Sequence, residues 1–259
     1  MELMQAVRTT FKRWQWARDL KMDLDVRRGK MLVDAERLQA RYEAALALLA
    51  ENGIPDADYL EFGVYNGTSM LCMHRALAKA GSTRSRLIGF DSFEGLPMAA
   101  AHDDGGVWEP GCYAASLEYT RRRLTREGID WSRAHLVKGW FSETATPQTA
   151  AALGLHQAGV IMIDCDIYSS TVDALRFCEP LIGGHAVIFF DDWHSFALAE
   201  KGQGEGRAFE EFLQAHADLQ AEPFESYGTA SEAFVLTRRK PADTCPPEGP
   251  RAGDARATD

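Results

Sequence analysis

Apolar residues follow two different rhythms along this chain. Up to residue 53 they recur at helical spacing, as at Leu38, Tyr42, Ala45 and Leu49, which predicts an amphipathic helix with one apolar face. Gly53 is typical of the end of such a helix. From residue 58 onward, short apolar runs alternate with helical stretches. This alternation predicts a parallel sheet covered by helices on both faces, which is the α/β class.

The predicted elements of this α/β region can be placed by residue. Five strands are expected at residues 59–63, 87–91, 135–138, 160–164 and 186–190. Helices are expected near residues 68–80, 115–127, 170–182 and 204–218. Two last strands, 222–227 and 233–237, are separated by a short loop. They predict an antiparallel pair that closes a mostly parallel sheet.

The chain divides into three predicted regions. Residues 1–53 form an N-terminal helical extension with a second apolar cluster at Phe11, Trp14, Trp16 and Leu20. We expect this extension to act as a lid or to pack against another subunit of a homo-oligomer. Residues 54–239 form the α/β domain. Residues 240–259 carry Pro, Gly and Asp but almost no large apolar residues, which predicts a disordered tail.

Two loops are long enough to be functional. Residues 94–114 form a Gly- and Pro-rich loop that contains Trp108 and Tyr113, and residues 197–206 form the second loop. Long loops in a compact domain are usually lids or binding loops. We therefore expect both loops to border a ligand site.

Composition narrows the class of partner. The net charge is −10, from 38 acidic and 28 basic residues, which argues against nucleic acid and against an anionic membrane surface. The five cysteines form no CxxC pair and no apolar run reaches membrane-spanning length. These features predict a cytoplasmic protein that acts on a small molecule.

Candidate chemistry lies at the ends of the predicted strands, where ligands bind in parallel sheets. Gly63 and Gly67 follow the first strand in a G-x-x-x-G turn, and Asp91 ends the second. A glycine turn lets a ligand approach the backbone, and the carboxylate can accept hydrogen bonds from both hydroxyls of a ribose. The pair favours an adenosine-containing ligand over the alternative, a solvated loop aspartate.

Three aspartates end the fourth and fifth strands: Asp164, Asp191 and Asp192. Adjacent parallel strands bring these carboxylates into one pocket, where their repulsion calls for a cation. Ligands that are all oxygen suit magnesium first, with manganese or calcium possible. The alternative is that Asp192 caps the next helix and Asp164 faces water.

Five blocks of sequence resemble the macrocin O-methyltransferase (TylF-type) family, in the same order. They are residues 59–69, 89–97, 138–144, 164–171 and 190–193. The resemblance implies a class I methyltransferase (Rossmann-like) fold and S-adenosyl-L-methionine as methyl donor. It implies metal ligands at Asp164, Asp191 and Asp192. The cofactor contacts that it implies are Glu61, Gly63, Val64, Tyr65, Gly67, Ser69, Asp91, Ser92, Phe93, Gly139, Trp140 and Phe141.

The resemblance also implies a reaction, the divalent-metal-dependent methylation of a sugar hydroxyl on a natural product or a nucleotide sugar. Some metal-dependent relatives place a Lys or His base three residues after the first metal aspartate, where this chain has Ile167. The candidate bases are therefore Asp164 and His194.

Other methyl acceptors stay open, namely a phenolic or polyketide hydroxyl or a sugar amine. A nicotinamide-dependent oxidoreductase and a non-catalytic scaffold are the remaining rivals. This chain lacks the third glycine that a nicotinamide-binding turn requires, which argues against the oxidoreductase. The three clustered aspartates argue against the scaffold, because a site without activity has no need of three repelling charges.

Overall fold

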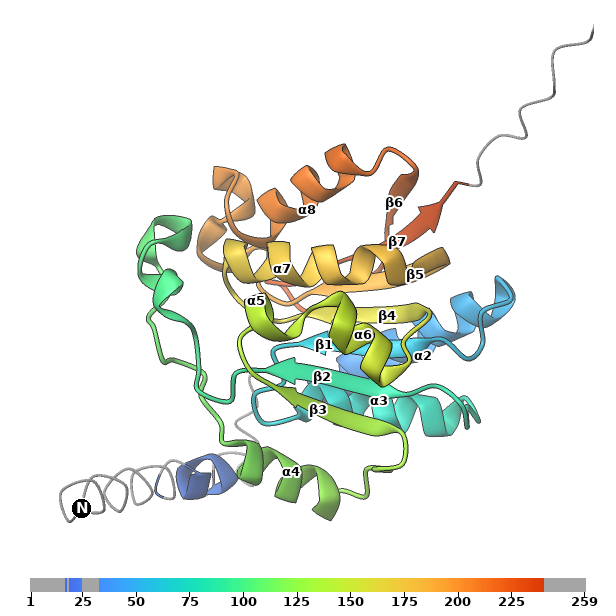
Figure 1. The fold of residues 1–259 in the computed structure, drawn as a ribbon, viewed down its shortest axis with the longest axis horizontal. Coiled ribbons are helices and arrows are strands. Elements are labelled where there is room, and N and C mark those ends of the chain that lie inside the picture. The colour runs from blue at the N-terminus through green and yellow to red at the C-terminus, as the bar shows by residue number, and fades with distance from the viewer. Residues whose placement is uncertain (1–16, 18, 25–32, 240–259) are drawn as a thin grey trace, which may run out of the picture.

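Seven strands form one sheet in the order β3-β2-β1-β4-β5-β7-β6 within the part of the chain that the structure describes (Figure 1). The structure is a computed structural model that describes residues 17, 19–24 and 33–239. The strands are β1 (Asp58–Phe62), β2 (Leu87–Asp91), β3 (Ala134–Lys138), β4 (Ala158–Ile163), β5 (Ile182–Phe190), β6 (Leu219–Pro223) and β7 (Glu232–Arg238). The helices are α2 (Ala35–Glu51), α3 (Thr68–Lys79), α4 (Leu117–Arg126), α5 (Phe141–Thr144), α6 (Pro147–Leu153), α7 (Tyr168–Cys178) and α8 (Gly204–Ala215).

The first five strands run parallel, and β7 pairs antiparallel with both β5 and β6. The predicted α/β class, with a mostly parallel sheet and a C-terminal antiparallel pair, is thus confirmed. The strand order reverses between β1 and β4. In sheets of this kind the crevice at such a reversal is where ligands bind.

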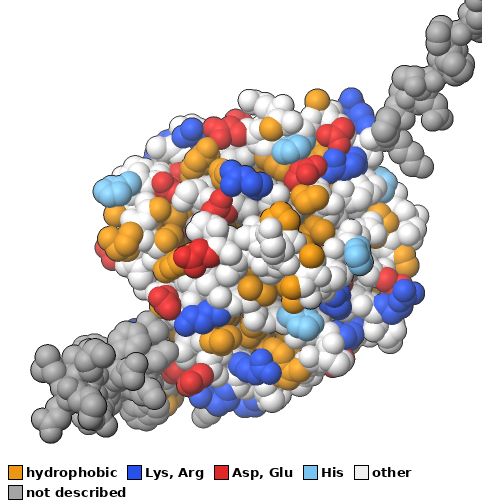
Figure 2. Space-filling view, viewed as in Figure 1, with side chains coloured by type: hydrophobic (Ala, Val, Ile, Leu, Met, Phe, Trp, Pro, Cys, Tyr) orange, Lys and Arg blue, Asp and Glu red, His pale blue; other side chains and the backbone are white. Residues whose placement is uncertain are grey.

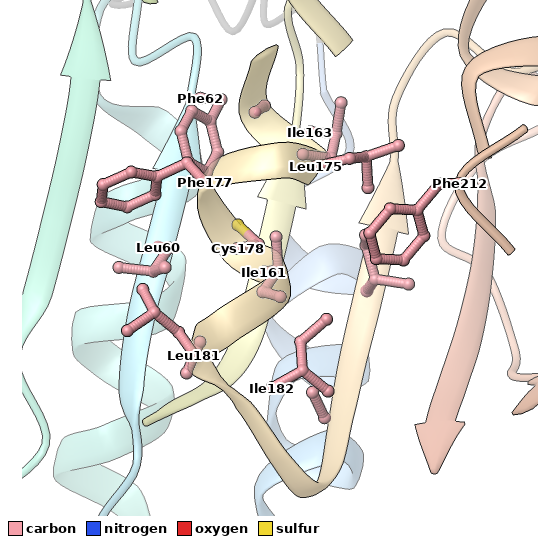
Figure 3. Close-up of a cluster of buried hydrophobic side chains, with 14 of the residues drawn as sticks. Leu60, Phe62, Ile161, Ile163, Leu175, Phe177, Cys178, Leu181, Ile182 and Phe212 are labelled. Atoms are coloured by element: carbon pink, nitrogen blue, oxygen red, sulfur yellow. The ribbon is translucent and has the colours of Figure 1, made fainter. Parts of the chain in front are cut away.

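Helices cover both faces of the sheet, so its central strands are apolar on both sides. Every residue of β1 and β4 is buried. On one face Phe62 and Ile163 pack against Leu175 of α7 and Phe212 of α8, a cluster drawn in Figure 3. On the other face the strands pack against α2 and α3. Burial on both sides explains why these strands read as continuous apolar runs.

Helix α2 is part of this core. Its predicted apolar stripe is fully buried, in one cluster with residues of β1, β4 and β5. The side chain of Asp34 accepts the N–H of Arg37 and so caps the helix at its N-terminus. Met22, from the short described piece before it, packs against Ala115 and Tyr119. The predicted subunit contact of the first residues and the predicted disordered tail, 240–259, lie outside the described residues.

Three element predictions need correction. The sixth strand is Leu219–Pro223 rather than 222–227, because β6 is an edge strand whose polar residues broke the apolar pattern. Helix α7 begins at Tyr168 and ends at Cys178, just before Pro180, rather than spanning 170–182. The short helices α5 and α6 were not predicted, although Thr146 followed by Pro147 is a helix-start signal.

The two long loops lie together beyond the carboxyl ends of the parallel strands, toward the left of Figure 1. On the face shown in Figure 2, the described Lys and Arg side chains are interspersed with Asp and Glu. None of the described helices is long and apolar enough to cross a lipid bilayer.

Candidate active site

A cavity of about 400 Å³ opens at the carboxyl ends of the parallel strands, where the strand order reverses. It is bordered by the turn after β1, the end of β2, the turn after β3, the segments after β4 and β5, and the loop before β7. Its lining includes these predicted site residues: Gly63, Val64, Tyr65, Ser69, Asp91, Ser92, Gly139, Trp140, Phe141, Asp164, Asp191 and Asp192. Glu61, Gly67, Phe93 and His194, also predicted, are not among the lining residues.

The glycines of the turn after β1 are required by the protein's own packing. Gly63 has a φ of 96°, and a Cβ there would lie 1.6 Å from the carbonyl oxygen of Asp164. Gly67 has a φ of 81°, and a Cβ would press on Leu124 of α4. No other residue type fits either position without strain. The two glycines lay the backbone of residues 64–66 along the wall of the cavity.

Asp91 braces this turn from the end of β2. One of its oxygens accepts the backbone N–H groups of Val64, at 2.8 Å, and Tyr65, at 2.7 Å. The other oxygen accepts the N–H of Phe93. Burial raises the pKa of Asp91, and the three N–H donors act in the opposite direction. Asp91, which was predicted to hold a ribose, therefore fixes the shape of the turn after β1.

Glu61 lies beneath the turn and is fully buried. One of its oxygens accepts the hydroxyl of Ser69 on α3. Burial raises the pKa of Glu61 to about 8. Its position suggests an indirect role, in which the carboxyl group fixes Ser69 at the start of α3.

The carboxylates after β4 and β5 converge as the strand order predicted. Asp164, Asp191 and Asp192 each offer an oxygen atom, and these atoms lie within 4.8 Å of one another. Burial and mutual repulsion raise the pKa of Asp164 well above its usual range and that of Asp191 to about 6. No Lys, Arg or His is among the described residues that line the cavity. A set of oxygen donors without a neighbouring cation fits a hard divalent ion.

Two further acidic residues belong to this cluster and were missed by the sequence analysis. Asp166 lines the cavity, is buried at a left-handed φ of 66°, and hydrogen-bonds with the side chain of Asp192. Glu205 of α8 is buried and accepts the backbone N–H of Asp192 at 3.0 Å. The sequence did contain a signal for Asp166, because this residue lies in block 164–171, the fourth of the blocks that resemble TylF-type sequences. Nothing in the pattern around Glu205 marks it, because it reads as a surface residue of a helix.

His194 points away from the carboxylate trio. Its Nδ1 lies 3.0 Å from a carboxylate oxygen of Glu200, and its Nε2 lies 3.5 Å from one of Glu232. Its backbone N–H donates to the carbonyl oxygen of Ala230. Both ring nitrogens therefore face glutamates outside the lining of the cavity. Ile167, in the position where some relatives have a base, is fully buried against an apolar cluster.

The two long loops contact each other, but the first contributes to the lining of the cavity and residues 197–206 of the second do not, contrary to the expectation that both border the site. Trp108 of the first loop contacts Phe196, the residue just before the second loop, edge to face, with ring centroids 4.9 Å apart. Asp104 accepts the N–H of Tyr168 at 2.9 Å and the N–H of Gly204 at 2.8 Å. The first loop also contributes Tyr113 to the cavity lining, which agrees with its prediction as a binding loop.

The sequence matches the macrocin-O-methyltransferase (TylF) family over residues 3–221. The chain belongs to this family. The match covers the carboxylate trio, both long loops and the lining of the cavity apart from residues 227–231. The five blocks that resembled TylF-type sequences are therefore explained by membership in that family.

Two curated relatives of this TylF-family chain are named as O-methyltransferases, and the name of the first includes a rhamnosyl group. The 8-demethyl-8-(2,3-dimethoxy-alpha-L-rhamnosyl)-tetracenomycin-C 4'-O-methyltransferase of Streptomyces olivaceus is 31% identical over 169 residues, 61% of this chain and 59% of that protein. The mycinamicin III 3''-O-methyltransferase of Micromonospora griseorubida is 30% identical over 167 residues, 60% of this chain and 61% of that protein. The matched region thus spans about three fifths of each relative.

Solved structures share the fold of this family member. The O-methyltransferase NovP superposes with a TM-score of 0.59 at 20% identity, over 79% of this chain and 80% of NovP. The calicheamicin methyltransferase CalS11 superposes with a TM-score of 0.61 at 21% identity, over 78% of this chain and 77% of CalS11. The predicted class I methyltransferase fold is confirmed.

Proposed function

We propose that this TylF-family chain is an S-adenosylmethionine-dependent O-methyltransferase that uses a divalent cation and acts on a sugar hydroxyl. One observation carries the proposal. In a chain of this family, the braced turn after β1 and the carboxylate trio line the same cavity at the reversal of the strand order. Methyl donor and acceptor can therefore meet within one site, and positioning of the reactants is a large part of such catalysis.

The residues that would hold the cofactor lie on the β1–β2 side of the cavity. The backbone of residues 63–66, the polar side chains of Asp91 and Ser92, and the rings of Trp140 and Phe141 line that side. This combination suits a nucleoside with a polar ribose and an apolar base. When bound, S-adenosylmethionine supplies a methyl group carried on a positively charged sulfur. The acidic lining of the cavity complements that charge.

The cation would be held by Asp164, Asp191 and Asp192, with magnesium first and manganese or calcium as alternatives. When bound, it supplies positive charge that lowers the pKa of a nearby hydroxyl. Protein groups already hold the ligands in place. The hydroxyl of Ser195 donates to Asp192 at 2.6 Å, and the phenol of Tyr227 donates to Asp191.

The proton acceptor that we propose is Asp166, in place of the expected Asp164 or His194. Asp166 lines the cavity beside Asp192 but lies outside the trio that would hold the cation. A carboxylate that binds a divalent cation is the weaker base, because the cation favours its ionised form. His194 faces two glutamates and not the cavity.

The acceptor is proposed from the relatives. The tetracenomycin enzyme is named as an O-methyltransferase of a rhamnosyl compound, and the mycinamicin enzyme as a 3''-O-methyltransferase of mycinamicin III. A third relative, 26% identical over 149 residues, is the demethyldecarbamoylnovobiocin O-methyltransferase of Streptomyces niveus. A sugar hydroxyl is therefore favoured over a phenolic or polyketide hydroxyl or a sugar amine. The nicotinamide-dependent oxidoreductase weighed as a rival has no counterpart among these relatives.

The proposal is tested by methyl transfer from labelled S-adenosylmethionine to a panel of neutral glycosides and nucleotide sugars. We expect a mass increase of one methyl group on a sugar, loss of turnover in EDTA, and recovery with magnesium. Asp192→Asn should lose turnover, whereas Asp56→Asn, at a surface ion pair with Arg84, should not. Turnover that persists in excess EDTA would remove the cation from the proposal. Methylation confined to phenols would contradict the proposal that the acceptor is a sugar hydroxyl.

A further inference from the structure

The loop between β6 and β7 forms a wall of the cavity. Residues 227–231 line it, because β7 runs antiparallel to β5 with Glu232 paired with Phe190. The residues just before β7 therefore reach those just after β5, where Asp191 and Asp192 stand. The wall is internally bonded, since the N–H of Gly228 donates to Ser231 Oγ at 2.8 Å.

Tyr227 joins this wall to the carboxylate trio. Its hydroxyl donates a hydrogen bond to Asp191 Oδ1, and its side chain is 3% exposed. The ring packs near Phe189, with centroids 6.3 Å apart. Burial and the charge of Asp191 raise the pKa of Tyr227 well above its usual value, so the phenol remains a donor. A buried bond of this kind leaves Asp191 little freedom to rotate.

We propose that Tyr227 is a positioning residue that fixes the Asp191 carboxylate for a divalent cation and makes residues 227–231 part of the cation site. The inference rests on the cation site proposed above. Groups that hydrogen-bond to a metal ligand orient it, and their loss typically weakens metal binding by roughly 10- to 100-fold. The same hydrogen bond links residues 227–231 to Asp191, a ligand of the proposed cation. Cation binding and the position of this wall of the cavity therefore depend on one hydroxyl.

The test is Mn²⁺ binding to metal-stripped full-length protein, measured by calorimetry for wild type and Tyr227→Phe. We expect the dissociation constant for Mn²⁺ to rise roughly tenfold or more. Affinity for S-adenosylhomocysteine should not change, because the cofactor residues lie on the other side of the cavity. Tyr119→Phe is the matched control. Tyr119 is similarly buried, but its hydroxyl lies 3.4 Å from Asp23, and neither residue lines the cavity.

The outcomes separate this inference from the proposed function. Equal Mn²⁺ affinity in wild type and Tyr227→Phe overturns the role of Tyr227 and leaves the cation site standing. Absence of Mn²⁺ binding in wild type overturns the cation site and the inference together. A parallel loss of S-adenosylhomocysteine affinity in Tyr227→Phe would show a general structural defect and would also overturn the positioning role.

Discussion

At the scale of single residues, Asp166 and His194 stand in contrasting surroundings. Asp166 is buried in the cavity beside Asp192, whereas His194 is partly exposed between Glu200 and Glu232. We expect Asp166→Asn to lower kcat by roughly 100-fold or more, the usual contribution of a general base. His194→Ala should stay within about fivefold of wild type, below that range. Steady-state kinetics with saturating S-adenosylmethionine measures both.

A binding measurement controls this comparison. Asp166→Asn should still bind Mn²⁺ and S-adenosylhomocysteine, because Asp166 lies outside the trio and the asparagine amide can still donate a hydrogen bond to Asp192. A large loss of kcat in His194→Ala, with Asp166→Asn near wild type, would move the base to the histidine. If neither variant loses activity, the base would be Asp164, the other candidate from the sequence.

The residues that could be predicted from sequence are those whose position follows from strand order. Asp164, Asp191 and Asp192 were expected together because adjacent parallel strands end at one edge. Asp166 could not be placed in this way, because its approach depends on a left-handed backbone conformation. Tyr227 was missed because it was assigned to a strand, whereas it lies in the loop that reaches back to Asp191.

At the scale of elements, the first long loop caps two helices at once. Asp104 accepts the first N–H of α7 and the first N–H of α8, and it is buried. Asp104→Ala should lower the free energy of unfolding by roughly 1–3 kcal/mol, because it removes a cap from each helix and buried hydrogen bonds to a charged group. Urea unfolding measures the change.

Asp103 provides the matched control for this prediction. It accepts a single N–H, that of Ser169 at 3.0 Å, and it is less buried than Asp104. Asp103→Ala should therefore destabilise the protein less. A change below about 0.5 kcal/mol for Asp104→Ala, the level of an ordinary surface substitution, would show that the loop is held by Trp108 and its apolar neighbours instead.

Elements were predictable where burial imposes a pattern. The five parallel strands were placed within a few residues, except that β5 begins at Ile182, four residues before its predicted start. The inner strands of this set are covered by helices on both faces, which produces their apolar runs. The edge strand β6 was misplaced because it pairs on one side only and tolerates polar residues. The docking of the loops through Asp104 and Trp108 depends on tertiary contacts that local patterns do not encode.

At the scale of the whole molecule, five acidic side chains gather at one place, two of them buried and the three of the trio half-buried. Asp164, Asp166, Asp191, Asp192 and Glu205 all have raised pKa values, because burial and mutual repulsion disfavour their charged forms. The folded protein without a cation therefore binds protons that the unfolded chain has released. The contribution of this cluster to stability is greatest below the ordinary carboxyl pKa and is lost as the pH rises through the raised values, about 6 for Asp191.

A divalent cation should reverse this trend, because it binds the deprotonated carboxylates. We expect the rise in Tm caused by magnesium to be small near about pH 5 and larger near about pH 8, where more of the cluster is ionised. Thermal unfolding in EDTA and in magnesium across this range measures the effect. Some pH dependence should remain with magnesium, because Glu61, with a pKa of about 8, lies outside the trio.

Sodium chloride at equal ionic strength is the control, since screening alone acts on exposed charges and much less on buried ones. Asp192→Asn should lose most of the gain from magnesium and should be more stable than wild type in EDTA at high pH, because one of the repelling charges is gone. A magnesium effect that is the same at both ends of the pH range, or that sodium reproduces, would place the cation on the surface of the molecule. The carboxylates of the trio would then have to remain protonated at neutral pH, and their proposed role would fail.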